Sequence, residues 1–562
     1  MKKPSLSEMT LREKIGQMLL PYQYHIYHDM DTPDKRERTM EEVAGYIEKE
    51  KFGSFYMEQV DVHGIDQPDL TAPDAPIMLA DDHKKFMEKQ DALGKIPAFM
   101  TIDAETEGAG KIFHDLSVTC KPLAIGAADS EELAFELGVC IGKELRCAGA
   151  NWRWAPCVDI SNRFALGYNR TYAPDDPDKI IKIANAHIRG VQSVGVAATA
   201  KHFPGADRYE YRDPHFCPNI ISSDMDEWWR EQGKIFREII NAGVYSVMVG
   251  HSGFPACDNS TLKGKYRPAT VSRKIVTDLL KGELGFKGVV VTDGIVMAGL
   301  TGCYDSYEEL IIDLVNAGND VLLGTYPGAG DIIEKAVAEG KISEARIDDA
   351  CSRILDMKEK TGLFDDDYKK LPYNSSDVAP QTKKVNTEIA RRAITKVYDR
   401  QNLLPLDKNK IKNVTIICST HYNGFFEKLS FIKKCIEDRG MTVRLQRRIG
   451  SDAEMDEIAK NSDLIIYAAY VAPHQPKGHI SLYGEECATY LYAFSKGNEK
   501  SIGLSMGHPT MHYEIMANAE TFINAYGMSP ELMEAFVEAI FGEIPIVGKS
   551  PVNLTPNRLI FT

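Results

Sequence analysis

Residues 197–215 read AATAKHFPGADRYEYRDPH, a short apolar run followed at once by polar and turn-forming residues. The run Val196–Ala200 has the length and composition of a buried strand, and Pro204-Gly205 indicates a loop behind it. Active sites of α/β proteins are built where such strands end and loops begin. The candidate functional residues at this junction are Lys201, His202, Asp213 and His215.

Similar apolar or β-branched runs recur through the first two-thirds of the chain, most of them about 45 residues apart. They are Phe52–Tyr56, Ala98–Ile102, Asn151–Ala155, Val196–Ala200, Val244–Val249, Val289–Thr292 and Asp320–Leu323. Helical segments with capping signals lie between them, such as the one opened by Ser306–Glu309 and closed by Gly318, and another over Ser223–Gly243. Strands alternating with helices predict an α/β fold with a parallel sheet, and seven or eight such units predict a (β/α)₈-type barrel.

Ionisable residues fall at the carboxyl ends of four of these runs. They are Asp103, Lys201, His202, His251 and Asp293. Each one alone also fits a helix cap or a turn former. Because the carboxyl ends of barrel strands share one rim, the set together predicts an active site there.

Beyond about Gly362 the composition changes to a polar, proline-marked connector, followed by a helix over about Lys383–Arg400 and then a second set of strands. These strands are Val414–Cys418, Thr442–Leu445, Leu464–Ala469, Ile502–Ser505 and Thr521–Ala525, with helical stretches at Phe425–Asp438 and Glu531–Phe541. We therefore expect a barrel over 1–370, a linker over 371–406 and a smaller α/β sandwich over 407–562. Neither G-x-G-x-x-G nor G-x-x-x-x-G-K-[ST] occurs, so no nucleotide cofactor is expected.

The composition of the chain limits the classes of function that it can have. The 562 residues are 43% hydrophobic and 26% charged, as in ordinary globular proteins of two to four domains. The net charge of −15 argues against nucleic acid or an anionic membrane as a partner and suits a small neutral substrate. The eleven cysteines contain no C-x-x-C, and no signal-peptide or membrane-spanning run is evident, so we expect no metal and a cytoplasmic location. A homodimer is compatible with the sequence.

Several stretches together resemble glycoside hydrolase family 3, and within it the β-N-acetylglucosaminidase branch. The matching stretches are 201–205 (KHFPG), Leu11–Leu20, Ile342–Ala350, Arg353–Lys358, Gly362–Phe364, Ala390–Leu406 and Gly548–Val552. The resemblance implies that Asp293 is the nucleophile, that His215 is the general acid/base and that Asp213 orients it. It implies that five residues hold the sugar in the innermost subsite: Asp103, Arg170, Lys201, His202 and His251.

The chain departs from the family pattern at three places. Gly294 stands where the family usually has a second Asp, Glu105–Gly108 replaces Glu-Gly-Gly, and the loop has Ala206 and Pro214 in place of His and Ser. These changes leave the nucleophile and acid/base positions in place and alter the pocket wall. The resemblance therefore implies a retaining, exo-acting β-N-acetylhexosaminidase, with β-glucosidase as the nearest alternative and a catalytically silent sugar-binding protein as the alternative from another class.

The residue types suit this chemistry on their own terms. A retaining glycosidase needs a nucleophile and a proton donor about 5–5.5 Å apart, and a histidine with a neighbouring carboxylate gives and takes protons near neutral pH. An Asp–His pair that merely fixes its loop is the alternative. Because a deprotonated histidine is neutral, inorganic phosphate can approach where a carboxylate would repel it, so a glycoside phosphorylase is a further alternative.

Overall fold

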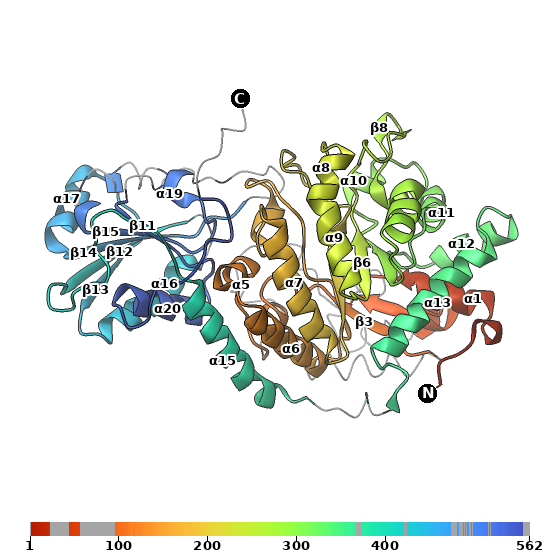
Figure 1. Ribbon diagram of the computed structural model, residues 1–562, viewed down its shortest axis with the longest axis horizontal. Coiled ribbons are helices and arrows are strands. Elements are labelled where there is room, and N and C mark those ends of the chain that lie inside the picture. Colours follow the sequence, from red (N-terminus) through yellow and green to blue (C-terminus); the bar gives the residue numbers. More distant parts are fainter. Residues whose placement is uncertain are drawn as a thin grey trace.

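The computed structural model describes residues 2–22, 44–56, 96–366 without 114, 368, 373–473 without 421 and 423, scattered positions between 480 and 500, and 501–554 without 515, 517 and 518. Two α/β units lie next to each other along the long axis of the molecule (Figure 1). The first two-thirds of the chain forms the unit at the right of that view. The last third forms the unit at the left.

The first unit is a barrel. A parallel sheet runs in the order β2 (Ser54–Tyr56), β3 (Phe99–Ile102), β4 (Trp152–Arg153), β5 (Ala197–Phe203), β6 (Ser246–Val249) and β9 (Val289–Thr292). Strand β1 (Leu19–Leu20) pairs in parallel with β10 (Leu322–Leu323). The bridge Val291↔Val321 joins this pair to β9, and Tyr22↔Tyr56 joins it to β2. The eight parallel strands of the described residues therefore close on themselves, which confirms the predicted (β/α)₈-type barrel.

The pattern of apolar runs located seven of these strands and missed β1. Leu19 and Leu20 continue directly from α1 (Leu11–Met18), so the apolar stretch looks like the end of that helix. A strand of two residues carries no period-2 signal of its own. Its place is set by pairing with β10, a contact some 300 residues away in the chain.

Helices surround the barrel strands. They are α1, α5 (Pro122–Ala128), α6 (Glu131–Cys147), α7 (Pro177–Gln192), α8 (Met225–Arg230), α9 (Gln232–Asn241), the π-helical segment Lys274–Glu283, α10 (Ala298–Thr301), α11 (Tyr307–Ala317), α12 (Ala329–Ala338) and α13 (Glu344–Lys360). Among the described helices, none combines the length and apolar character needed to cross a bilayer. A small hairpin of β7 (Thr261–Leu262) and β8 (Lys265–Tyr266) rises beyond β6.

Capping residues fix the helix starts. Ser306 accepts a hydrogen bond from the backbone of Glu309, and Gly318 ends α11 with φ of 116°, as the sequence predicts. The stretch predicted as one helix over Ser223–Gly243 is instead two helices, and Asp224 caps the first. The break falls at Glu231, whose backbone leaves the helical region at φ −113° and ψ −90°.

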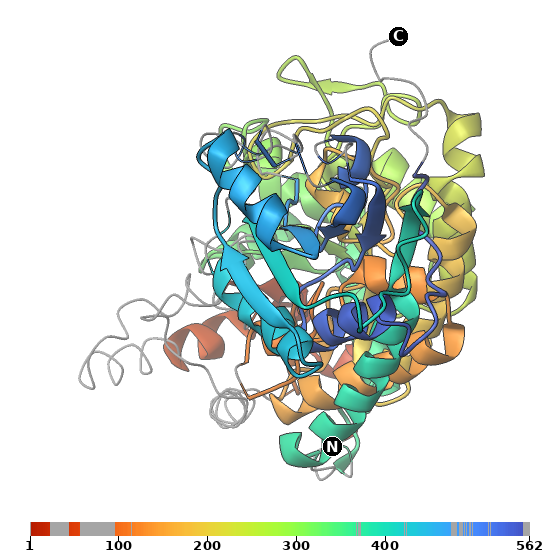
Figure 2. The ribbon, with the colours of Figure 1, turned by 90° about the vertical axis from the view of Figure 1, so that its left-hand side faces the viewer.

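The second unit is a six-stranded sheet. Its order is β11 (Thr395–Asp399), β16 (Thr521–Asn524), β15 (Ser501–Ser505), β14 (Leu464–Ala469), β12 (Asn413–Ser419) and β13 (Thr442–Gln446). Only β11 runs antiparallel to its neighbour in this sheet. Alternate residues enter opposite cores, since Ile416 packs toward α16 (Phe425–Glu437) and α20 (Pro530–Ile540), whereas Ile417 packs toward α17 (Asp452–Asn461). Figure 2 views the molecule from the side of this sheet.

The stretch predicted as a linker contains regular structure. Helix α15 spans Ser375–Ala393, earlier than the helix predicted over about Lys383–Arg400, and it lies against α5 and α6. Residues 395–399 then form β11, because the β-branched TKVYD sequence pairs with β16. The domain limits at 370 and 406 stay a prediction. One apolar cluster runs without a break from the α5–α7 side of the barrel into the second unit.

Candidate active site

Asp293 lies one residue beyond β9, at the carboxyl rim of the barrel. Its backbone N–H donates to Val249 O at 2.9 Å, and its Oδ1 accepts from Gly294 N at 2.8 Å. Burial by itself raises the pKa of this carboxyl group, but the imidazoles of His202, His251 and His215 with Lys201 lower it to about 2. Asp293 is therefore a carboxylate at neutral pH.

His202 is the last but one residue of β5 and faces the nucleophile candidate. Asp159 accepts from the His202 backbone N–H at 2.9 Å and contacts its Nδ1 at 2.8 Å. The opposite ring nitrogen, Nε2, then lies 3.8 Å from Oδ2 of Asp293. Two bonds from one carboxylate fix the ring, so Asp159 determines which nitrogen of His202 faces Asp293.

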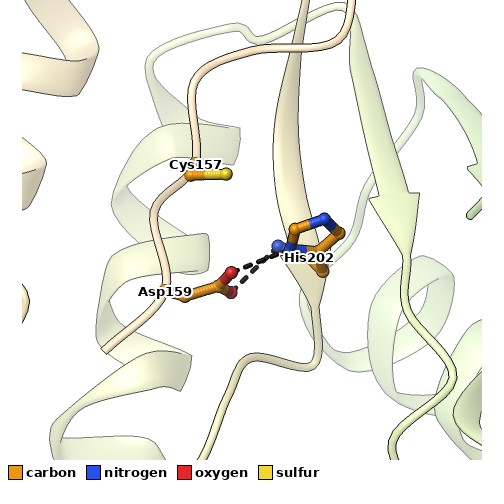
Figure 3. Close-up of side chains that lie close together, drawn as sticks. All are labelled: Cys157, Asp159 and His202. Carbon is orange, nitrogen blue, oxygen red and sulfur yellow. Dashed lines mark hydrogen bonds and ion pairs between the residues drawn. The ribbon is translucent and has the colours of Figure 1, made fainter. Parts of the chain in front are cut away.

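Cys157, Asp159 and His202 form a compact group (Figure 3). Their potential ligand atoms lie within 4.8 Å of one another, which raises the question of a metal. Burial and the neighbouring Glu105 raise the pKa of the Cys157 thiol well above its usual value, which disfavours the thiolate a metal needs. With Lys201 also close by, the group fits a hydrogen-bonded support for His202 better than a cation site.

Asp213 and His215 form a second histidine–carboxylate pair on the loop after β5. Oδ1 of Asp213 lies 2.6 Å from His215 Nδ1 and accepts from the His215 backbone N–H at 2.9 Å. Burial by itself lowers the pKa of His215, but the bond and charge of Asp213, together with the charge of Asp293, raise it above its usual value. The converse holds for Asp213, whose pKa burial raises but His215 lowers. Nε2 of His215 is left to carry the exchangeable proton.

A buried network of charges joins β3, β5 and the loop after β4. Lys201 Nζ lies 2.7 Å from Asp103 and 3.3 Å from Glu105, and Arg170 clamps Glu105 with two bonds of 2.5 Å. Burial raises the pKa of Glu105, but Arg170 and Lys201 hold it well below its usual range. Tyr56 Oη donates to Asp103 at 3.1 Å. The cluster presents fixed charges of both signs, an arrangement suited to sugar hydroxyl groups.

His251 lies on the same rim but is held by protein groups on both sides. Its Nδ1 lies 2.8 Å from Thr270 Oγ1 and its Nε2 lies 3.0 Å from Gly294 O. Because a carbonyl only accepts, Nε2 carries the proton, and burial lowers the pKa of this ring. The ring thus braces the turn after Asp293, while its predicted contact with a sugar stays a prediction.

The departure at Gly294 has a structural reason. A Cβ at this position would collide with the Tyr22 hydroxyl group, and the ring of Tyr22 also covers Gly324. Tyr22 packs edge-on against Tyr56, which in turn stacks on Trp154 with centroids 4.8 Å apart. An aromatic wall from β1, β2 and β4 thus occupies the space that a second Asp would take.

The second unit supports the loop that carries Arg170. His508 contacts Arg163 O through Nε2 at 2.8 Å and stacks on Tyr168 at 4.9 Å between centroids. Burial lowers the pKa of His508 to about 3, so the stacked ring is neutral. Arg163 also donates to Tyr513 Oη at 3.0 Å. The second unit therefore holds the segment that leads to Arg170.

The structure gathers the eight predicted site residues on one rim, and it adds partners that the sequence did not single out. Asp159 and Tyr56 are chief among them, together with Glu105, which entered only as part of an altered motif. Tyr56 ends a predicted strand, and Asp159 and Glu105 each follow one by a few residues. Their place at or just after a predicted strand could have marked these residues as candidates for the site. Which residue each of them contacts depends on the closed barrel.

A closed parallel barrel with a carboxylate and a histidine–carboxylate pair on its carboxyl rim offers the nucleophile and the proton donor that a (β/α)₈ glycoside hydrolase needs. The sequence profile described as the glycosyl hydrolase family 3 N-terminal domain matches residues 10–357. The chain belongs to this family and is one of its glycosidases.

Individual relatives agree with this assignment. A β-N-acetylglucosaminidase/β-glucosidase of Cellulomonas fimi is 26% identical over 502 residues, covering 85% of this chain and 87% of its own. A solved β-glucoside phosphorylase superposes with a TM-score of 0.81 at 25% identity, covering 98% of this chain and 95% of its own. A family 3 β-N-acetylglucosaminidase from Paenibacillus sp. superposes with a TM-score of 0.77 at 24% identity, covering 98% and 100%.

Proposed function

We propose that this enzyme is a retaining, exo-acting β-glycosidase, chiefly a β-N-acetylhexosaminidase, that works through a covalent glycosyl-Asp293 intermediate. The observation that carries the proposal is the pairing of an ionised Asp293 with His215, each of which lies in the other's electrostatic field. The names of the relatives support the sugar class, because the Cellulomonas fimi enzyme is described with both N-acetylglucosaminidase and glucosidase activity.

In the first half-reaction the Asp293 carboxylate attacks the anomeric carbon. A bond forms between that carbon and the Asp293 oxygen, while the bond to the aglycone oxygen breaks and its electron pair leaves with that oxygen. His215 donates its Nε2 proton to the departing oxygen and becomes neutral. The raised pKa of His215 supports this role, since it favours the protonated ring that the step needs.

In the second half-reaction neutral His215 takes a proton from water, and the water oxygen attacks the anomeric carbon. The bond to Asp293 breaks, the carboxylate is restored, and the sugar leaves with its original configuration after two inversions. Asp213 stabilises the imidazolium that forms again. Each half-reaction uses the same two groups in opposite senses.

Four side chains are proposed to hold the sugar while this happens. Asp103 and Arg170 offer an acceptor and a donor from opposite sides of the charge network, and Lys201 and His202 complete the set at the end of β5. Their mutual ion pairs keep them ordered before substrate arrives, so little freedom is lost on binding. His251 is proposed to act indirectly, by holding Gly294 beside Asp293.

A glycoside phosphorylase is the second candidate. In that reaction a phosphate oxygen attacks the glycosyl-Asp293 carbon, the bond to Asp293 breaks, and a sugar 1-phosphate leaves. Neutral His215 does not repel the anion, and the structural neighbour described as a β-glucoside phosphorylase favours the same reading. Nearby cations are partly neutralised by ion pairs, because Glu210 binds Arg212 and two carboxylates bind Lys201.

One assay separates these candidates. The protein is incubated with a panel of nitrophenyl β-glycosides, with and without millimolar phosphate, and the products are analysed. We expect the N-acetylglucosaminide to be the best substrate. A preference for glucoside would make it a β-glucosidase, and a sugar 1-phosphate in the presence of phosphate would make it a phosphorylase. No turnover of any glycoside would leave a silent sugar-binding protein and contradict the proposal.

A further inference from the structure

The loop that carries the acid/base pair is bound through its backbone to the turn that follows the nucleophile. Pro214 O accepts from Gly299 N at 2.9 Å, and His215 O accepts from Ala298 N at 3.1 Å. Both donors belong to the first residues of α10, which starts five residues after Asp293. Two groups that are remote in the sequence are thus connected by two main-chain hydrogen bonds.

Gly299 makes this approach possible. A Cβ at this position would lie 2.6 Å from Pro214 O and 3.2 Å from Cys217 O. The first distance is shorter than carbon–oxygen contact allows, and both obstacles are backbone atoms that cannot rotate away. The backbone of Gly299 does not have a positive φ, so it is the missing side chain that matters here. Any larger residue must push the acid/base loop off α10.

The base of the same loop is held independently. Oδ1 of buried Asp207 accepts from Tyr209 N at 2.5 Å and from Glu210 N at 3.1 Å, and its Oδ2 accepts from the backbone and hydroxyl group of Ser222. These bonds tie the start of the loop to its end. A push at the tip therefore displaces the Asp213–His215 pair as one piece, relative to Asp293.

We propose that Gly299 is a positioning residue: by letting Pro214 and His215 dock on α10, it sets the separation between the acid/base His215 and the nucleophile Asp293. This inference rests on the proposed function. Retaining cleavage requires about 5–5.5 Å between the two groups, and a misplacement of about 1 Å costs on the order of 100-fold in rate. The contact therefore adjusts the one distance on which both half-reactions depend.

The test compares Gly299→Ala with Gly282→Ala, a matched control. A Cβ at Gly282 meets nothing closer than Thr277 O at 3.4 Å, an ordinary contact, and the residue lies in the π-helical segment Lys274–Glu283, which precedes the amino end of β9. With poor leaving groups, such as alkyl glycosides, Gly299→Ala should lower kcat/KM by about 100-fold. With dinitrophenyl glycosides, which leave without a proton, the loss should stay under about tenfold.

The response to azide distinguishes a positioning role of Gly299 from a merely structural one. Azide attacks a glycosyl-enzyme without a general base, so it should speed the turnover of dinitrophenyl glycosides by Gly299→Ala and yield a glycosyl azide. Wild-type enzyme and Gly282→Ala should not respond. Melting temperatures of the three proteins check that the fold is retained.

If Gly299→Ala fails to fold, a second variant still tests the proposal. Ala298→Pro removes the N–H that His215 O accepts, at the first position of α10, where proline is well tolerated. Met297 precedes it with φ −64° and ψ 137°, which suits a residue before proline. The same selective loss and azide response are expected.

Equal losses for good and poor leaving groups, or no loss in a folded variant, would overturn the inference. Failure of the proposed function is a different result, since it would show as an inactive wild type or as an Asp293→Ala variant that still turns over.

Discussion

Two histidine–carboxylate pairs flank Asp293, and they differ in how they are mounted. His202 ends a barrel strand and Asp159 holds it through both backbone and ring, whereas His215 and Asp213 share a loop that leans on α10. The side chain of His202 is 22% exposed and that of His215 is 37% exposed. The same chemical pair is thus proposed to serve two purposes: a fixed neighbour for the nucleophile, and a proton carrier at the edge of the site.

The mounting explains the division of work. His202 Nε2 lies 3.8 Å from the Asp293 carboxylate, on the side of the attacking group, and it stabilises the ionised form there. His215 has a raised pKa and a partly exposed side chain, which suits the proposed exchange of protons with a leaving group or with water. In this proposal, geometry and not residue type decides which pair carries the proton.

The largest effect should come from removing the group that both pairs face. Asp293→Ala should lower turnover by at least ~10⁴-fold with every leaving group, because no other described group is placed to attack the anomeric carbon. Steady-state kinetics measure this, and a melting temperature near that of the wild type shows that the fold remains. A variant that kept more than about a tenth of the wild-type turnover would show that Asp293 is not the nucleophile.

Deleting each imidazole should separate the two roles. His215→Ala should cost about 10²- to 10⁴-fold with poor leaving groups and far less with dinitrophenyl glycosides, because only the former need a proton. His202→Ala should cost a similar factor with both kinds of substrate, since it acts on the nucleophile side. If the two variants showed the same dependence on leaving group, the assignment of roles would be lost.

Replacing the carboxylate of either histidine–carboxylate pair should have a smaller effect, which is seen in the dependence of kcat/KM on pH. The alkaline limb of kcat/KM reports loss of the His215 proton and should lie above pH ~6.5, the unperturbed value. Asp213→Asn removes the charge that raises the pKa of His215, so the limb should move to lower pH. Asp159→Asn is the matched control and should leave the limb in place. The acid limb belongs to Asp293, with its pKa of about 2, and should fall below pH 4.

The sequence predicted the barrel and the rim because both follow from local patterns. Apolar runs mark the strands, and residues such as Asp293 and Lys201 stand directly at their ends. It did not predict β1, which is a strand only through its pairing with β10. Nor did it pair Asp159 with His202 or Glu105 with Arg170, because these contacts span 43 and 65 residues and exist only once the barrel closes.

Gly294 is a further case in which the sequence does not show a contact between remote segments. The sequence shows a glycine where the family usually has an acid, but not that Tyr22, from the far end of the barrel sequence, fills the vacated space. Likewise, the chain gives no local sign that His508 of the second unit stacks beside the Arg170 loop. Such contacts between remote segments determine the shape of the pocket wall. The substrate is therefore harder to predict from the sequence than the reaction.

The most direct test of the account is to trap the intermediate that both pairs are proposed to serve. A fluorosugar with an activated leaving group slows the second half-reaction, so the glycosyl-enzyme accumulates and the modified peptide is identified by mass spectrometry after digestion. We predict one added sugar, on the peptide that contains Asp293, and none on the Asp293→Ala variant. A label on any other residue, or none while the enzyme turns over, would contradict a double displacement through Asp293.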